Sequence, residues 1–89
     1  MTGPSTQWLA EALAVLEPEH LSIEDDSAAH AGHAGARSGG GHYTVTVVSA
    51  RFSGLNRVAR HRLVYTALGD LMKTRIHALA LVALAPDEL

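Results

Sequence analysis

Cysteine is absent from this chain of 89 residues. Its absence excludes disulfide bonds, a thiolate nucleophile, and any zinc or iron–sulfur site held only by cysteines of the chain itself. Aromatic residues amount to 4% of the sequence, and no apolar run approaches the roughly 20 residues that span a bilayer. The first residues, MTGPSTQWLAEAL, lack the basic start of a signal peptide. We therefore expect a cytoplasmic protein without a membrane segment.

Strong charge of either sign is also missing, because the net charge is -2 at pH 7 and 18% of the residues are charged. This balance is too mild to keep the chain disordered by self-repulsion or to draw it onto nucleic acid as a whole. The length is that of one compact domain, which we place over residues 1–89.

The first part of the chain contains a helical pattern followed by a strand-like one. Apolar side chains recur at helical spacing, with Ser5 or Thr6 available as the N-cap and Pro18 as the stop. These apolar residues are Trp8, Leu9, Ala12, Leu13 and Leu16. Residues 20–26 then alternate apolar with polar side chains, which predicts a strand with one buried face.

Residues 28–41 offer almost no side chain to bury, because five of them are glycine and five are alanine. We therefore predict a flexible Gly/Ala-rich loop at about residues 27–41. Loops of this length in a small domain are commonly either functional or merely disordered, and the sequence alone favours neither.

The second half of the chain predicts a strand, a long helix and another strand. Residues 42–52 are rich in the β-branched and aromatic side chains that suit strands. From Asn56 an apolar stripe of helical period continues past Gly69, which predicts one long helix through that glycine. The stripe consists of Val64, Ala67, Leu68, Leu71 and Met72. The apolar run at residues 75–86 predicts a strand buried on both faces.

The resulting order is helix, strand, strand, helix, strand, with a final turn from Pro86. A helix that connects two strands makes a crossover, so the second and third strands should run parallel. The first strand should pair antiparallel with the second. We expect an α+β fold with a three-stranded mixed sheet.

Histidine is the unusual residue of this composition, since there are six. They are His20, His30, His33, His42, His61 and His77. Imidazole is a common metal ligand and titrates near neutral pH. Taken alone, His77 reads as a histidine at a strand end that is hydrogen-bonded to the backbone, and His30 and His33 read as solvated loop residues.

Blocks of residues in the second half resemble the BolA-like protein family. They read VS-x-RF-x-G at residues 48–54, RHR-x-VY-x-x-L at residues 60–68, and HALAL at residues 77–81. The stretch LSIEDDSAAHAGHAG also resembles the first strand and loop of that family, so the resemblance covers roughly residues 8–89. It implies a fold similar to the class II KH domain, α-β-β-α-β, with helices packed on one face of a small mixed sheet.

The resemblance further implies a monothiol glutaredoxin partner and a shared cofactor. In that family a [2Fe-2S] cluster is held between the glutaredoxin cysteine with glutathione on one side and histidines of the BolA protein on the other. The family's ligand histidine falls on His77, and the loop ligand falls on His30 or, because this loop is longer, on His33. The implied role is iron–sulfur cluster assembly, trafficking or iron regulation, and the isolated chain is expected without cofactor, as a monomer or weak homodimer.

The alternative function is DNA binding, because bacterial members of the family are described as transcriptional regulators of stress response and cell morphology. Residues 51–89 hold six basic and three acidic side chains, whereas residues 1–50 hold one and six. The candidate contacts to nucleic acid or to a protein partner are Arg57, Arg60, His61, Arg62, Lys73 and Arg75, of which the first three share one side of the predicted helix. An ordinary solvated helix face explains them equally well. The string GHAG lies between two predicted strands rather than two helices, so we expect weak, salt-sensitive DNA contact at most.

An enzyme is not expected from this sequence. No nucleophile with a general base, phosphate loop or pair of carboxylates in a pocket can be assembled. The adjacent Glu24, Asp25 and Asp26 lie at a strand end and point alternately to opposite faces.

Overall fold

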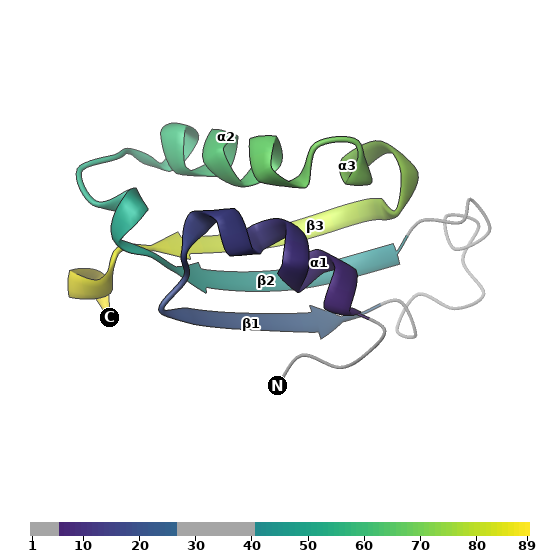
Figure 1. Cartoon of the computed structure of the whole chain (residues 1–89), viewed down its shortest axis with the longest axis horizontal. Helices are drawn as coiled ribbons and strands as arrows, with labels where there is room; N and C mark the ends of the chain where they lie inside the picture. Colours follow the sequence, from purple (N-terminus) through teal and green to yellow (C-terminus); the bar gives the residue numbers. More distant parts are fainter. Residues whose placement is uncertain (1–5, 27–40) are drawn as a thin grey trace.

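The computed structural model describes residues 6–26 and 41–89, whose helices and strands follow the predicted order (Figure 1). The helices are α1 (Gln7–Leu13), α2 (Arg57–Leu68) and α3 (Leu71–Thr74). The strands are β1 (His20–Asp25), β2 (Gly41–Val48) and β3 (Ile76–Leu84). Short 3₁₀ turns follow α1, β2 and β3, namely η2 (Ala14–Leu16), η5 (Ala50–Phe52) and η6 (Pro86–Glu88).

The strands form one mixed sheet with β2 at its centre. Strand β1 pairs antiparallel with β2, and β3 pairs parallel with β2. Figure 1 shows α1 in front of the sheet and α2 alongside β3, and both helices contribute side chains to the same core. The predicted α+β fold is therefore confirmed, and the long connection through α2 accounts for the parallel pair.

The core lies between the helices and one face of the sheet. Alternate residues of β2 point into it, because Tyr43, Val45 and Val47 are buried while Thr44 and Thr46 are partly exposed. This is the period of two that the sequence predicts. The side chains from outside the sheet that pack into this core include Leu9, Leu13, Leu16, Phe52, Val64 and Leu68.

Turn chemistry places the helices on the sheet. Asn56 is the N-cap of α2, and its side-chain oxygen accepts a hydrogen bond of 2.8 Å from the backbone N–H of Ala59. At the end of η2, Glu17 adopts a left-handed conformation just before Pro18, so the first helical segment stops where the sequence predicts. No helix in the described ranges 6–26 and 41–89 is long and apolar enough to cross a membrane.

The prediction of one long helix through Gly69 is wrong. Helix α2 ends at Leu68, and Gly69 has φ of 55° and ψ of -130° before the separate helix α3. Glycine adopts a positive φ without the steric cost of a Cβ atom, so the chain turns there. The apolar period nevertheless continues, because Leu71 and Met72 from α3 still pack against the core.

The prediction that the last strand is buried on both faces is also wrong. Strand β3 is an edge of the sheet, and Ala78, Ala80 and Val82 are exposed on the face away from the core. Its other face is partly buried through Leu79 and Leu81. An apolar run cannot separate these two cases, since small alanines tolerate exposure at little cost.

The predicted loop at residues 27–41 lies almost entirely outside the described residues. Gly41 is the exception, since it is the first residue of β2 rather than part of a loop.

Candidate functional site

His77 is an extra residue in the pairing between β2 and β3. Gly41 is opposite Ile76, and the next residue, His42, is opposite Ala78, so His77 has no partner position on β2. This is a β-bulge, which changes the direction of a side chain and is rare in parallel pairs. Ile76 points into the core, whereas His77 is exposed. The bulge therefore presents an imidazole at the surface from within an ordered strand.

His42 lies next to His77. Their ring centroids are 5.0 Å apart, and the ring planes are tilted by 44°. Sequence reasoning did not select His42 as a ligand, because its closeness to His77 depends on the register between β2 and β3. Each histidine is the second residue of its strand, and parallel strands that pair from their first residues bring such positions together.

A small surface cavity of about 250 Å³ extends from His42 along the open face of the sheet. Asp26 and Thr44 line it, together with Ala78 and Ala80 from β3. The Thr44 hydroxyl donates a hydrogen bond of 2.5 Å to the Asp26 carboxylate, and the Asp26 N–H donates one of 2.7 Å to the His42 carbonyl. These bonds fix the end of β1 beside the histidine pair.

The segment that contains His30 and His33 starts and ends beside this pair. Its two flanking residues are Asp26, bonded to His42, and Gly41, whose N–H donates a hydrogen bond of 3.0 Å to the Arg75 carbonyl. His30 and His33 themselves lie outside the described residues. The residues that flank 27–40 therefore lie at the end of the sheet that carries His77.

Aromatic packing supports the histidine pair from the core side. Tyr43, which follows His42, meets Trp8 of α1 edge-on at 5.6 Å, and the Arg75 guanidinium lies 4.1 Å from the centre of the Trp8 ring. Burial, together with the nearby negative charge of Asp25, raises the pKa of Tyr43, and Arg75 partly opposes this shift. The Tyr43 ring also occupies the space that a Cβ atom on residue 41 would need, so Gly41 fits there without a side chain.

The described residues supply nitrogen donors but not a complete metal site. Within residues 6–26 and 41–89, no group of three or more histidine, aspartate or glutamate side chains could hold a metal ion. His77 and His42 together offer a pair of imidazoles, and cysteine is absent from the whole chain. Any metal or cluster here would need further ligands from residues 27–40 or from a partner.

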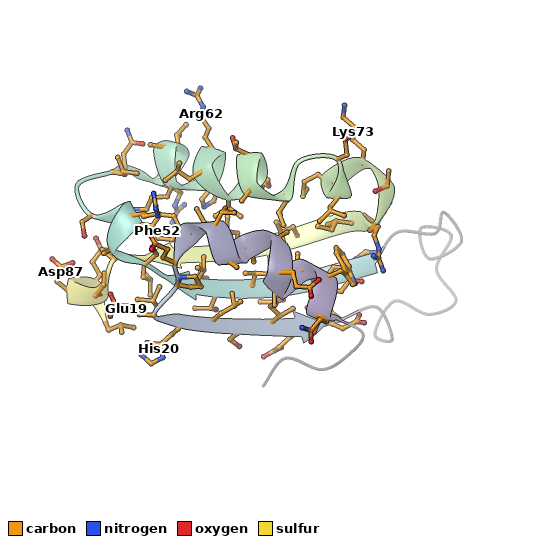
Figure 2. The ribbon with its side chains drawn as sticks, viewed as in Figure 1. Glu19, His20, Phe52, Arg62, Lys73 and Asp87 are labelled. Atoms are coloured by element: carbon orange, nitrogen blue, oxygen red, sulfur yellow. The ribbon has the colours of Figure 1, made fainter. Side chains whose placement is uncertain are left out.

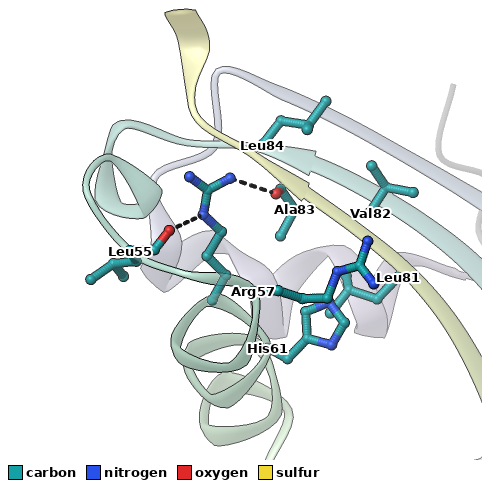
Figure 3. Close-up of a pocket in the computed structure, with 8 residues that line it drawn as sticks. Leu55, Arg57, His61, Leu81, Val82, Ala83 and Leu84 are labelled. Atoms are coloured by element: carbon teal, nitrogen blue, oxygen red, sulfur yellow. Dashed lines mark hydrogen bonds between the residues drawn. The ribbon is translucent and has the colours of Figure 1, made fainter. Parts of the chain in front are cut away.

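The basic residues of α2 lie at the other end of β3. Arg57, Arg60 and His61 line a cavity of about 330 Å³ with Leu55 and residues 81–84 of β3. Figure 3 shows the Arg57 and His61 side chains beside the strand. The grouping of these three residues on one side of the helix is therefore confirmed.

Arg60 is held by the protein itself. Its guanidinium donates hydrogen bonds to the carbonyls of Leu55 at 2.8 Å and Ala83 at 3.1 Å, and to the Glu88 carboxylate at 2.5 and 2.7 Å. The bonds from Arg60 and from the Ala85 N–H lower the pKa of Glu88 from 4.5 to about 2. In this cavity Arg57 and His61 are consequently the basic groups that remain for an external ligand.

The remaining basic candidates are not part of this cavity. Arg62 on α2 and Lys73 on α3 point away from the sheet, as Figure 2 shows. Arg75 stacks on Trp8 near the histidine pair. The six candidate residues do not form a single basic face.

Comparison with known proteins places these features in a family. Residues 12–88 match the family model described as BolA-like protein. The chain is 47% identical over 76 residues to the chloroplastic protein BOLA1 of Arabidopsis thaliana, covering 82% of this chain and 48% of that protein. It is 48% identical over 65 residues to the DNA-binding transcriptional regulator BolA of Vibrio cholerae, covering 73% of this chain and 58% of that protein.

A solved structure, the BolA domain of SufE1 from Arabidopsis thaliana, superposes with a TM-score of 0.82 at 38% identity and full coverage of both chains. The chain spans about half the length of the curated BOLA1 protein that it matches. These matches agree with the α-β-β-α-β order of the elements and with the sequence blocks around Phe52, Arg60 and His77. The chain belongs to the BolA-like protein family.

Proposed function

We propose that this chain is an adaptor that binds a monothiol glutaredoxin and co-ligates a bridging [2Fe-2S] cluster, in iron–sulfur cluster assembly, trafficking or iron regulation. One observation supports it above the others. His77 is displayed by a β-bulge at the surface, 5.0 Å from the ring of His42, in a chain without cysteine. A partner that supplies thiolates would complement this all-nitrogen donor set.

The donor set fits such a cluster. Histidine replaces cysteine at one iron in known two-iron clusters, which raises the reduction potential. His77 would be the fixed ligand, because its strand is hydrogen-bonded to β2. The second ligand would be His30 or His33, and His42, 5.0 Å from the ring of His77, is a third candidate.

The chain's own residues would orient these ligands. Hydrogen bonds at Asp26 and Gly41 hold the two flanks of the segment beside the pair. Exposure of His77 leaves it accessible to a partner without opening the core. A ligand set that contains imidazole loses affinity on protonation, so release of a shared cluster at lower pH follows from the same chemistry.

The test is anaerobic reconstitution of the chain with a monothiol glutaredoxin, glutathione, iron and sulfide, followed by visible absorption and circular dichroism. We expect His77→Ala to abolish the spectrum of the mixed complex. His20→Ala is the matched control, because this exposed histidine lies at the opposite end of the sheet, opposite Val48. A mixed-complex spectrum unchanged in His77→Ala would refute the proposal.

Single substitutions of the other histidines identify the second ligand. His30→Ala, His33→Ala and His42→Ala are each compared with wild type in the same reconstitution. The true ligand should give a loss close to that of His77→Ala, while a neighbour that only positions His77 should shift the spectrum without abolishing it. Three unchanged spectra would leave His77 as the only ligand from this chain.

DNA binding is the second candidate, supported by the name of the Vibrio cholerae relative. In this chain Arg60 is bound to Glu88, and Arg62 points away from the cavity. A titration with duplex DNA at several salt concentrations tests it, since phosphate contacts give a salt-dependent affinity. Arg57→Ala should then weaken binding and reduce the salt slope, and an unchanged slope would count against this candidate.

We also propose that this chain is located in the cytoplasm. The Arabidopsis relative is named as chloroplastic. Fractionation of the native host with an antibody to this chain would decide between the compartments.

A further inference from the structure

Strand β3 exposes the backbone of one edge. Only β2 pairs with β3 among the described strands, so its outer edge carries peptide groups that no described strand satisfies. Most natural edge strands are protected by proline, charged side chains, short length or a β-bulge, and the bulge of β3 lies at its start, before Leu79. Strand β3 has nine residues, and neither proline nor a lysine, arginine, aspartate or glutamate occurs among them. The stretch after the bulge therefore lacks the side chains that usually prevent another strand from pairing.

Two hydrogen bonds establish which peptide groups point outward. The Leu84 carbonyl accepts from the Ser49 N–H, on the β2 side, whereas the Ala83 carbonyl accepts from Arg60, on the outer side. Successive residues of a strand direct their peptide groups to opposite edges. The peptide groups of Leu79 and Leu81 therefore point to the outer edge, as that of Ala83 does. The Ala83 carbonyl already accepts a hydrogen bond from Arg60. A new strand would therefore pair with the peptide groups of Leu79 and Leu81.

The outer edge of β3 leads into the basic cavity. Leu81 lines that cavity of about 330 Å³ together with Arg57 and His61, which come from the first turns of α2 (Figure 3). Arg57 is exposed and His61 is partly exposed. Glu88 pairs with Arg60, so the positive charge that faces an incoming ligand in this cavity comes from Arg57.

We propose that β3 is a docking edge for an extended peptide segment of another protein, whose backbone pairs with Leu79 and Leu81 and whose acidic side chain enters the cavity beside Arg57 and His61. Strand addition of this kind takes its affinity from main-chain hydrogen bonds and its specificity from side-chain pockets. The carboxylate provides the specificity, because charge-assisted bonds to arginine are stronger than neutral ones.

A second copy of this chain fits the edge less well. Two copies related by a two-fold axis would pair β3 antiparallel with β3. The cavity of one copy would then face the start of β3 in the other, where Arg75 and His77 lie. Basic groups would oppose basic groups, whereas an acidic segment is complementary. The proposal is independent of the cluster, and its test uses no iron.

The direct test is amide hydrogen exchange by NMR with two synthetic probes, acetyl-TVTVDD-amide and acetyl-DDTVTV-amide. They place the acidic end beside the cavity in a parallel or an antiparallel arrangement, respectively. At nine-tenths occupancy, we expect the binding probe to slow exchange of the Leu79 and Leu81 amides about tenfold. The amides of Ala80 and Val82 point to β2 and should change little. Absence of protection at Leu79 and Leu81 with both probes would overturn the proposal.

Two substitutions on α2 test the role of charge. Arg57→Ala should weaken binding of the acidic probe about three- to fivefold, as expected for a partly exposed ion pair. Arg62→Ala is the matched control on the same helix and should leave the affinity unchanged, because Arg62 points away. The neutral probe acetyl-TVTVNN-amide should bind wild type more weakly than its acidic counterpart. Equal effects of the two arginine substitutions would contradict a specific pocket.

Leu81→Pro tests the backbone contact itself. Proline removes the outward N–H, and edge strands accept proline where that N–H faces solvent. We expect the variant to lose probe binding, while Leu81→Val keeps it. If Leu81→Pro fails to fold, the exchange experiment and the arginine pair still decide the question. A single-stranded thymidine octamer that binds through Arg57 when neither peptide binds would instead assign the cavity to nucleic acid.

Discussion

At the scale of single residues, Ser49 joins three segments that are distant in the sequence. It is 1% exposed, its hydroxyl donates a hydrogen bond of 2.6 Å to the Leu16 carbonyl, and the same oxygen accepts one from the Arg51 N–H. Its own N–H donates to Leu84 at the end of β3. The end of the first helical segment, the turn after β2 and the last strand therefore meet at one buried hydroxyl.

Ser49→Ala should lower the free energy of unfolding by about 1–3 kcal/mol, because the buried Leu16 carbonyl and the partly buried Arg51 N–H lose their partner. Urea denaturation followed by circular dichroism measures the change. Ser22→Ala, at an exposed position of β1, is the control, and its free energy of unfolding should stay within about 0.5 kcal/mol of wild type. Equal stability of the Ser49 and Ser22 variants would contradict this role.

Glu88 makes stability depend on acid pH. Its pKa is about 2 in the folded chain, below the ordinary 4.5, chiefly because Arg60 donates hydrogen bonds to it. A lowered pKa means that the stabilisation is complete above pH 4.5 and is lost as the pH falls from 4.5 towards 2. Wild type should therefore have a higher urea midpoint than Glu88→Gln near neutral pH, and the two midpoints should converge as the pH approaches 2.

Glu24→Gln, at an exposed position of β1, is the control for this pH series. Near neutral pH its urea midpoint should differ from that of wild type by less than the midpoint of Glu88→Gln does. A constant difference between wild type and Glu88→Gln across the acid range would show that the ion pair does not contribute.

The sequence predicted residue positions correctly where neighbouring residues on one helix determine them. The grouping of Arg57, Arg60 and His61 follows from helical spacing alone. His42 was missed because its closeness to His77 depends on the register between two strands, which no local pattern encodes. The engagement of Arg60 by Glu88 was missed for the same reason, since 28 residues separate them.

At the scale of elements, Gly69 separates α2 from α3. Its φ of 55° with ψ of -130° is the mirror image of a β conformation, which L-amino acids adopt only with strain. Nearby atoms leave room for a methyl group, because the nearest, the Thr66 carbonyl oxygen, is 3.9 Å from a Cβ placed there. Any cost of substitution would thus come from the backbone and not from packing.

Gly69→Ala should accordingly destabilise the chain by about 1–3 kcal/mol. The matched control is the same position carrying D-alanine, introduced by chemical synthesis, whose preferred backbone conformation is the mirror image. D-alanine should be neutral or stabilise by about 0.4–1 kcal/mol, since it restricts the unfolded chain. Thermal unfolding of both variants measures the difference, and equal melting temperatures would refute the assignment of strain.

Periodicity predicted which segments form helices and strands, but not how they end or which faces they bury. The apolar stripe continues from Leu68 to Leu71 across Gly69, so the break is invisible to a pattern of hydrophobicity. The strand at residues 76–84 reads as fully buried because all but one of its residues are apolar. Its position at the sheet edge is a property of topology, which the sequence pattern does not specify.

At the scale of the whole molecule, β3 connects two surfaces of different character. The histidine pair lies at its start, and the basic cavity lies at its end. Val82 is five positions after His77, which corresponds to roughly 17 Å along a strand. Sites that far apart with no shared partner act independently in most proteins.

Substitutions at the two ends should therefore not affect each other's function. Arg57→Ala should leave reconstitution of the cluster with glutaredoxin unchanged, and His77→Ala should leave binding of the acidic peptide probe unchanged. Both variants should also retain the wild-type melting temperature, because both side chains are exposed. Mutual effects on binding would mean that one partner covers the whole length of β3.

The stack of Arg75 on Trp8 places a fluorescent side chain close to the histidine pair. Trp8 is the sole tryptophan of the chain, it touches Tyr43 beside His42, and the cation above it is two residues from His77. Indole emission responds to a charge held over the ring. A ligand that binds His42 and His77 would act close to Tyr43 and Arg75, so we expect the Trp8 emission of unlabelled protein to change on binding.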